Sequence, residues 1–312
     1  MTAPILEPTQ DNIARATDVL RSGGLVALPT ETVYGLAADA ANSVAVANLY
    51  KAKGRPHFNP LIAHVVDIDM ATQQGVFSNH ARLLAVAYWP GPLTIIVDAG
   101  PDIAVCDLAR AGLDSVALRI PAHPVAQAVL GAFGAPLVAP SANPSGQISP
   151  TCAAHVAADM GDKVDLILDG GPCASGLEST IIDARGANPA LLRPGGLDPL
   201  QVDAIWPGLI RLSSDPDAPQ SPGQLLRHYA PAARLRLNAS APEAGEAYLG
   251  FGPGQYDLNL SEAADLGEAA ANLFAMLRRL DARHDRIAVA AIPHDGLGEA
   301  INDRLTRAAE PG

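Results

Sequence analysis

The stretch LVALPTETVYGL, residues 25–36, says most about the architecture of this chain. Its first four residues are apolar and run into a proline, which predicts a short buried strand. The polar residues directly behind, two threonines, a glutamate and a tyrosine, lie beyond a strand end, where open α/β sheets bind their ligands. The stretch therefore predicts an α/β fold with a candidate site at residues 29–36, although a turn with a helix cap explains the same residues equally well.

A second apolar run, residues 136–140, leads into Ser141-Ala142-Asn143 in the same way. The run predicts a strand over 137–139. The loop behind it presents a hydroxyl and an amide, which can set the geometry of hydrogen bonds to an oxygen-rich ligand. A local turn closed by the Asn143 side chain is the alternative interpretation.

Positive charge is concentrated in one short segment between these two strands. The chain has a formal net charge of −12 and only three lysines, two of which, Lys51 and Lys53, stand beside Arg55. Ammonium and guanidinium groups form strong ionic hydrogen bonds to phosphate. We therefore expect Lys53 and Arg55 to bind a phosphate-bearing ligand, with Asn59 orienting it. A solvated basic loop is the alternative.

Three other positions are candidates because of their places on predicted strands. Period-two alternation puts Ser115 and Arg119 on one face of the chain. Arg193 ends another predicted strand, and His64 lies inside an apolar one. An arginine at a strand end can simply close an ion pair, and a lone histidine in an apolar strand is more often a satisfied core residue.

The order of predicted elements divides the chain into two α/β domains. Over residues 1–206 helices and strands mix irregularly, which predicts a twisted, partly antiparallel sheet with helices packed on it. Residues 207–232 hold five prolines and no clear periodicity, as linkers do. Residues 233–312 predict a small second α/β domain, with strands at 233–237, 247–251 and 287–292 and helices at 261–280 and 298–309.

Composition and motifs narrow the functional classes. The net charge of −12 disfavours nonspecific binding to nucleic acid. The three cysteines, Cys106, Cys152 and Cys173, fit neither a zinc pattern nor paired disulfides, so we expect a cytoplasmic protein with reduced thiols and no protein-built metal site. No signal peptide is visible, and no apolar run approaches the ~20 residues of a membrane span. P-loop, dinucleotide, serine-hydrolase and zinc-peptidase motifs are all missing from the sequence.

Taken together and in this order, the polar segments resemble the YrdC/TsaC family of L-threonylcarbamoyladenylate synthases. The matching stretches span about residues 9–206 and include the family's paired signatures, Lys-x-Arg at Lys53 and Arg55 and Ser-x-Asn at Ser141 and Asn143. The segment SPGQLLRHYAP, residues 221–231, looks like the linker of the long two-domain form. The resemblance implies a twisted mixed sheet with a concave basic cavity, followed by a small Rossmann-like α/β domain.

The resemblance also implies a reaction, in which L-threonine, bicarbonate or CO₂ and ATP give threonylcarbamoyl-AMP and pyrophosphate. Separate proteins would then transfer the threonylcarbamoyl group to the adenosine beside the anticodon of certain tRNAs. Mg²⁺ is expected to accompany ATP, held mainly by phosphates and water. The residues similar to the family's ATP contacts are Arg55, Asn59, Ser115, Arg119, Ser141, Asn143, Ser149, Arg193 and Tyr229. Those similar to its L-threonine contacts are Thr32, His64, Ser179 and the backbone near Ala139, and the residues expected to act in catalysis are Lys53 and Arg55.

Two other functions stay open at this stage. One is a related enzyme that forms a carbamoyl adenylate with another amine, and the other is a non-catalytic RNA-binding module. The net charge and an aromatic content of 4% disfavour the second, although a direct contact with tRNA is left open. The linker segment 221–231 leads to one more hypothesis, that it closes over the cavity as a lid and keeps water away from a labile adenylate.

Overall fold

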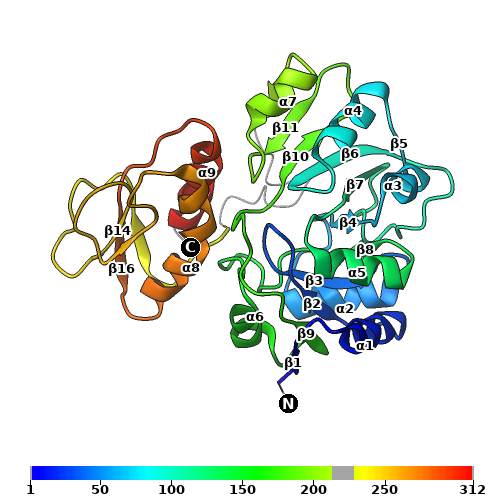
Figure 1. The fold of residues 1–312 in the computed structure, drawn as a ribbon, viewed down its shortest axis with the longest axis horizontal. Coiled ribbons are helices and arrows are strands. Elements are labelled where there is room, and N and C mark those ends of the chain that lie inside the picture. The colour runs from blue at the N-terminus through cyan, green and yellow to red at the C-terminus, as the bar shows by residue number, and fades with distance from the viewer. Residues whose placement is uncertain (1, 213–227, 311–312) are drawn as a thin grey trace.

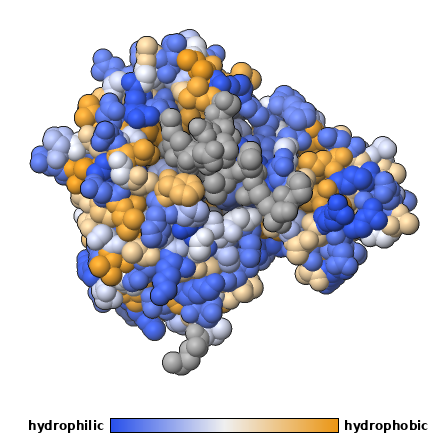
Figure 2. Space-filling view, turned by 180° about the vertical axis from the view of Figure 1, so that it is seen from behind, coloured by the Kyte–Doolittle hydropathy of each residue, from blue (hydrophilic) through white to orange (hydrophobic). Residues whose placement is uncertain are grey.

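The computed structural model of the chain describes residues 2–212 and 228–310. These residues form two α/β domains, each built on its own sheet, which lie side by side (Figure 1). Figure 2 shows the two lobes from the opposite side, with hydrophilic residues spread over much of both surfaces. Within the described ranges, every helix is too short or too polar to serve as a membrane span.

The N-terminal domain contains a mixed sheet of 12 strands, whose path runs β1-β9-β2-β3-β8-β4-β7-β6-β10-β11-β12, with β5 paired to β6. Parallel and antiparallel pairings are mixed along this path, as the irregular order of elements predicted. In chain order the strands are β1 (Ile5–Leu6), β2 (Val26–Leu28), β3 (Gly35–Asp39), β4 (Ile62–His64), β5 (Gly75–Val76), β6 (Leu93–Ala99), β7 (Ser115–Arg119), β8 (Leu137–Val138), β9 (Leu166–Leu168), β10 (Thr180–Asp183), β11 (Ala190–Arg193) and β12 (Ile210–Arg211).

Helices cover the sheet through two apolar clusters. One cluster joins α1 and α5 to β2 and β9, and a larger one joins α2, α4, α6 and α7 to the sheet from β9 to β11. The helices of this domain are α1 (Gln10–Arg21), α2 (Ser43–Lys53), α3 (Ile68–Gln74), α4 (Asn79–Tyr88), α5 (Pro124–Phe133), α6 (Ala153–Met160) and α7 (Pro199–Ile205).

Successive side chains of the central strands point alternately to the helix-covered core and to the face that carries the candidate site. On β7, Val116 and Leu118 belong to the larger helix-covered cluster, whereas Ala117 belongs to a small separate cluster with Ile62. Because successive side chains point to opposite faces of a strand, Arg119 shares the face of Ala117, and His64 on β4 shares the face of Ile62. The sheet therefore presents its polar strand-end residues on the face that α4 does not cover.

The C-terminal domain contains a four-stranded sheet in the order β13-β16-β14-β15, and all of its pairings are parallel. The elements are β13 (Arg234–Arg236), β14 (Ala247–Gly250), β15 (Leu258–Asn259), α8 (Leu266–Asp281), β16 (Arg286–Val289) and α9 (Leu297–Ala309). The stripe of apolar residues on α8 packs into a core that also takes in Val33, Ile148 and Leu177 of the N-terminal domain. The two domains thus share a continuous apolar contact, while the narrower Rossmann-like assignment stays a prediction.

Several element boundaries differ from the expectation for local reasons. Helix α2 extends through Lys53, so this lysine does not belong to the basic loop considered for the segment, and the helix ends at Gly54 with a positive φ of 61°. Such a left-handed residue is the usual helix stop, and glycine adopts it without steric strain. The helix expected from residue 261 begins at Leu266, because Asp265 caps it through the backbone N–H of Glu268. Of the predicted linker, residues 213–227 lie outside the described residues.

Candidate functional site

A pocket lies on the polar face of the N-terminal sheet, and separate segments of the chain supply its walls. The predicted site residues that line it are Thr32, Arg55, His64, Arg119, Ala139, Ser141, Ser179, Arg193 and Tyr229. The other predicted residues are buried nearby without lining the pocket: Lys53, Asn59, Ser115, Asn143 and Ser149. Segments that lie far apart in the sequence therefore converge, as the resemblance implied.

Arg55 lies in this pocket with neutral hydrogen-bond partners. Its guanidinium donates to the Asn59 Oδ1 atom at 2.6 Å and to the Pro60 carbonyl at 2.8 Å, both of which are neutral acceptors. Burial, together with the positive charge of Arg193, lowers the pKa of Arg55 to about 10, so it stays charged at neutral pH. A buried guanidinium held by neutral groups favours an anionic ligand.

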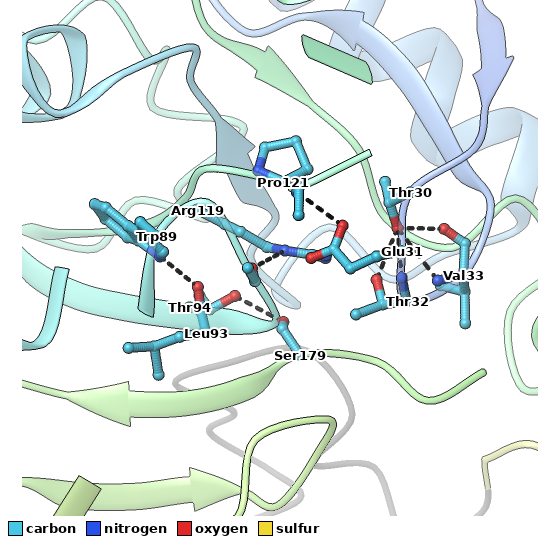
Figure 3. Close-up of polar contacts among 12 residues, drawn as sticks. Thr30, Glu31, Thr32, Val33, Trp89, Leu93, Thr94, Arg119, Pro121 and Ser179 are labelled. Carbon is cyan, nitrogen blue, oxygen red and sulfur yellow. Dashed lines mark hydrogen bonds and ion pairs between the residues drawn. The ribbon is translucent and has the colours of Figure 1, made fainter. Parts of the chain in front are cut away.

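Arg119 is oriented by a carboxylate in the middle of the first quoted stretch. Its Nη2 donates to Glu31 at 2.6 Å, and the Ala122 backbone N–H donates to the other carboxylate oxygen at 3.0 Å (Figure 3). Burial alone would raise the pKa of Glu31, but the adjacent Arg119 charge and hydrogen bonds hold it below its ordinary value. Glu31 therefore stays ionised and fixes Arg119 at the wall of the pocket.

Arg193 is held at the start of β10. Its Nη2 donates to the Ser179 carbonyl at 2.8 Å and to the Ser179 hydroxyl at 3.2 Å. The same hydroxyl lies 2.7 Å from the Thr94 hydroxyl, and Thr30 and Thr32 form a matching hydroxyl pair at 2.7 Å (Figure 3). One hydroxyl of each pair, that of Ser179 and that of Thr32, belongs to a residue that lines the pocket.

Lys53 of the first signature contacts the backbone of the second signature, residues 141–143, and does not line the pocket. Its ammonium donates to the backbone carbonyls of Ser141 and Asn143, and it is only 3% exposed. Burial, with the positive charge of Arg55 beside it, sets the pKa of Lys53 well below its ordinary value. Lys53 thus fixes the loop that carries Ser141, whereas Arg55, two residues later, lines the cavity.

His64 is neutral in this site. Burial, reinforced by the charge of Arg119, lowers its pKa to about 3, and its Nδ1 lies 3.3 Å from the Ile62 carbonyl. His64 is thus a buried histidine inside an apolar strand, and it also lines the pocket. A neutral imidazole can donate or accept one hydrogen bond to a polar substrate.

Two linker residues line the pocket and narrow it. His228 and Tyr229 are buried in it and leave about 50 Å³ of free volume, whereas small-molecule sites usually enclose roughly 300 Å³ or more. Tyr229 has a positive φ of 62°, which is strained for a bulky side chain, and its hydroxyl has no hydrogen-bond partner within the described residues. Both side chains therefore line the pocket with a polar atom that lacks a partner within the described residues, and Tyr229 does so from a strained backbone position.

Three residues near the pocket were not predicted as site residues. Glu31 stands in the first quoted stretch, where it carried no assigned role, Glu178 directly precedes the predicted Ser179, and Arg304 comes from α9 of the other domain. The position of Glu31, three residues after a strand end, is a signal that could have found it. Nothing in the periodicity of α9 distinguishes Arg304, because its role depends on how the two domains pack.

The pocket does not contain a built metal centre. The part of the chain that the structure describes has no group of three or more histidine, cysteine, aspartate or glutamate residues close enough to hold a metal ion. Both carboxylates beside the pocket, Glu31 and Glu178, are paired with arginines.

Comparison with known proteins agrees with this geometry. A Sua5/YciO/YrdC family model with the description "Telomere recombination" matches residues 18–195. A second model, "Threonylcarbamoyl-AMP synthase, C-terminal domain", matches residues 200–310. The threonylcarbamoyl-AMP synthase of Bacillus subtilis is 40% identical, over 97% of this chain and 94% of its own length.

Solved structures show the same arrangement of domains. The chain superimposes on a crystal structure of Pyrococcus abyssi Sua5 complexed with L-threonine with a TM-score of 0.91. That comparison covers 99% of this chain and 97% of the other, at 35% identity. Escherichia coli YciO, at 24% identity and a TM-score of 0.55, shares the fold over 62% of this chain. The chain belongs to the Sua5/YrdC family, in the two-domain form whose N-terminal domain holds the arginine-lined pocket and whose C-terminal domain is that of threonylcarbamoyl-AMP synthases.

Proposed function

We propose that this chain is an ATP-dependent threonylcarbamoyl-AMP synthase. It joins L-threonine, bicarbonate or CO₂ and ATP into threonylcarbamoyl-AMP and releases pyrophosphate. The observation that supports this most is the convergence of Arg55, Arg119 and Arg193, from three separate segments, on one buried pocket in a member of this family. The named relatives and the threonine-bound neighbour point to the same substrates.

The chemistry explains the need for buried cations. The threonine amine attacks the carbon of bicarbonate or CO₂, and the resulting N–C bond makes a carbamate, with loss of water when bicarbonate is the donor. A carbamate oxygen then attacks the α-phosphorus of ATP, and the bond to the β-phosphate oxygen breaks as pyrophosphate leaves. Both reactants are anions, so positioning and charge stabilisation supply most of the acceleration.

We assign the residues of the pocket to an ATP side and a threonine side. Arg55 and Arg193, with Arg119, lie where they can bind the triphosphate and the charge that develops on the leaving pyrophosphate. Asn59, Ser115, Ser141, Asn143 and Ser149 shape the ATP side, and Lys53 acts by holding the Ser141 loop. Thr32, His64, Ser179 and the backbone at Ala139 form the threonine side.

Mg²⁺ enters this scheme as part of the substrate. ATP carries the ion on its phosphates, and Mg²⁺ usually keeps several waters while it is held by one or two carboxylates and the substrate. Glu31 and Glu178 are each ion-paired with an arginine. We therefore propose that phosphates and water, and not these carboxylates, hold most of the ion.

The described end of the linker supports a lid. His228 and Tyr229 occupy space that ATP needs, in a strained position with unpartnered polar atoms. ATP binding therefore requires them to leave, and their return would cover the adenylate and exclude water. The residues 221–227 of the proposed lid lie outside the described residues.

The product is expected to pass to separate proteins that transfer the threonylcarbamoyl group to tRNA. We place these steps in the cytoplasm, where tRNA is modified and the three reduced cysteines are stable. Direct tRNA binding is not assigned to any surface of this chain.

Pyrophosphate release across amino acids tests the proposal. The purified chain is incubated with Mg·ATP and each amino acid, with and without bicarbonate, and the nucleotide products are separated. We expect rapid pyrophosphate release and a threonylcarbamoyl-AMP peak only when threonine and bicarbonate are both present. Faster turnover with another amine would instead identify a related carbamoyl-adenylate synthase, and salt-sensitive RNA binding without any turnover would identify an RNA-binding module.

A further inference from the structure

Arg304 is a fully buried arginine that reaches the pocket from the other domain. It lies on α9 of the C-terminal domain and is 1% exposed. Its Nε donates to a carboxylate oxygen of Glu178 at 2.8 Å, and its Nη2 donates to the Pro194 carbonyl at 2.9 Å. Its remaining Nη1 donates to Asp303 at 2.5 Å. All three nitrogens of the guanidinium are therefore engaged, and two of them contact the N-terminal domain.

Glu178 is the carboxylate that this arginine neutralises. It lines the pocket beside Ser179 and Arg193, and its other oxygen accepts a hydrogen bond from the Ser149 hydroxyl at 2.5 Å. Burial alone would raise the pKa of Glu178, but the charges of Arg304 and Arg193 hold it below the ordinary value. An ionised carboxylate thus stands in the wall of a pocket that has to accept ATP.

We propose that Arg304 is a positioning residue of the ATP site, which neutralises Glu178 from the C-terminal domain so that the pocket can bind a triphosphate. This inference rests on the proposed function. Without Arg304, the uncompensated Glu178 carboxylate would repel both ATP and the carbamate, because like charges interact strongly in a partly buried site. The C-terminal domain thereby completes the catalytic pocket of the N-terminal one.

The surroundings of Glu178 define how this arrangement should respond to pH. Besides Arg304, the charged and titratable groups that face it are Asp303 from α9, Arg193 from β11, and His228 and Tyr229 from the linker. With Arg304 removed, burial dominates and the pKa of Glu178 rises. Lower pH would then protonate Glu178 and remove the repulsion.

Arg304→Met and the double variant Glu178→Gln/Arg304→Met test the inference. Both are assayed for pyrophosphate release as a function of ATP concentration and for binding of an uncleavable ATP analogue. We expect Arg304→Met to raise the ATP concentration for half-maximal rate by on the order of ten- to a hundredfold. The double variant should return this ATP concentration towards the wild-type value, although it has lost the same ion pair. Arg304→Lys should show a smaller increase in this concentration than Arg304→Met.

The pH profile and a matched control variant distinguish two effects of losing Arg304: an uncompensated Glu178 charge and a weaker contact between the domains. The defect of Arg304→Met should shrink as pH falls from about 8 to about 6, and that of the double variant should not change. Arg278→Met removes another arginine–carboxylate pair between the domains, the 2.5 Å contact with Asp159, and should leave the ATP dependence unchanged. Equal defects in the single and double variants, or the same loss in Arg278→Met, would overturn the inference. A wild-type chain that releases no pyrophosphate with threonine and bicarbonate would instead contradict the proposed function.

Discussion

Arg55 shows at the scale of one residue why the pocket favours an anion. Its donors are fixed by neutral oxygens of Asn59 and Pro60, so its charge is available to a ligand. We expect Arg55→Ala to reduce turnover by about 10²-fold or more, the usual effect of removing one electrostatic donor. Arg55→Lys should recover little, because an ammonium lacks the planar fork. Wild-type pyrophosphate release by Arg55→Ala would contradict the role of this arginine.

Lys53 is predicted to act on both stability and turnover. Lys53→Met keeps most of the apolar stem but leaves the carbonyls of Ser141 and Asn143 without their shared donor. Each unpaired buried carbonyl costs about 1–3 kcal/mol, so urea unfolding should show a lower free energy of unfolding. Turnover should fall as well, because the Ser141 loop loses its anchor. An unchanged unfolding midpoint together with lost activity would instead indicate direct contact of Lys53 with the substrate.

His64 should make the stability of the fold depend on pH. Its pKa is about 3 in the folded chain, against an ordinary value of 6.5. Between these values the unfolded chain binds a proton that the folded chain does not, so stability is complete above the higher value and falls as pH drops. The slope from one such group is at most ~1.4 kcal/mol per pH unit.

The measurement compares wild type with His64→Gln, because other buried histidines, including His228, titrate in the same direction. Unfolding free energies at several pH values between about 4 and 7 should show a shallower pH dependence in the variant. Parallel curves for the two proteins would mean that His64 is not buried in its neutral form.

At the scale of elements, the linker segment at Tyr229 is predicted to protect the product. Tyr229 stacks on Phe274 of α8, with ring centroids 5.6 Å apart, and lies under Arg304. Tyr229→Ala, or deletion of residues 221–231, should open the pocket and let water reach the adenylate. We expect more AMP and less intact threonylcarbamoyl-AMP per pyrophosphate released, measured by chromatography. Unchanged product formation and retention after the deletion would refute the lid.

Most elements were predictable because their signals are local. The strand predicted at 25–28 is β2, the strand predicted over 137–139 is β8, and the helix predicted at 298–309 is α9. Strand β3 (Gly35–Asp39) was not predicted, because its first two residues were taken as part of the polar stretch 29–36 and no strand was expected behind it. It forms only because β2 and β8 pair with it on either side. A tertiary partner, and not local propensity, decides such a strand.

The residues of the candidate site, like the elements, were predictable where their signal is local and not where it depends on tertiary contacts. The sequence identified the cations and small polar residues of the pocket, because lysine is scarce and the signatures are short. It did not distinguish Arg55, which lines the cavity, from Lys53, which faces two carbonyls. That difference depends on where α2 ends, at Gly54. Arg304 was out of reach, because its partner Glu178 is separated from it by 126 positions and by a domain boundary.

At the scale of the whole molecule, one glycine controls how closely the two domains pack. Gly176 has a φ of +69°, and a Cβ there would come within 2.5 Å of the backbone of Ala270 and Ala271 on α8. Gly176→Ala should therefore destabilise the protein by about 1–3 kcal/mol and loosen the docking of the C-terminal domain.

Thermal unfolding and limited proteolysis measure this effect. Gly171→Ala is the matched control, since Gly171 has a φ of +81° but its added Cβ would meet nothing within 4 Å. The control should carry only the backbone strain, with the domains still docked. Equal proteolysis of the two variants would show that the close approach at Gly176 does not hold the domains together.

A structure with L-threonine and an uncleavable ATP analogue tests the central claim most directly, that the arginine-lined pocket of the N-terminal domain is where the two substrates meet. We predict that the triphosphate lies against Arg55 and Arg193, that threonine lies beside Thr32 and Ser179, and that His228 and Tyr229 have moved out of the space they occupy here. A nucleotide bound instead in the interdomain cavity lined by Ile148 and Arg278, with Tyr229 still in place, would contradict it.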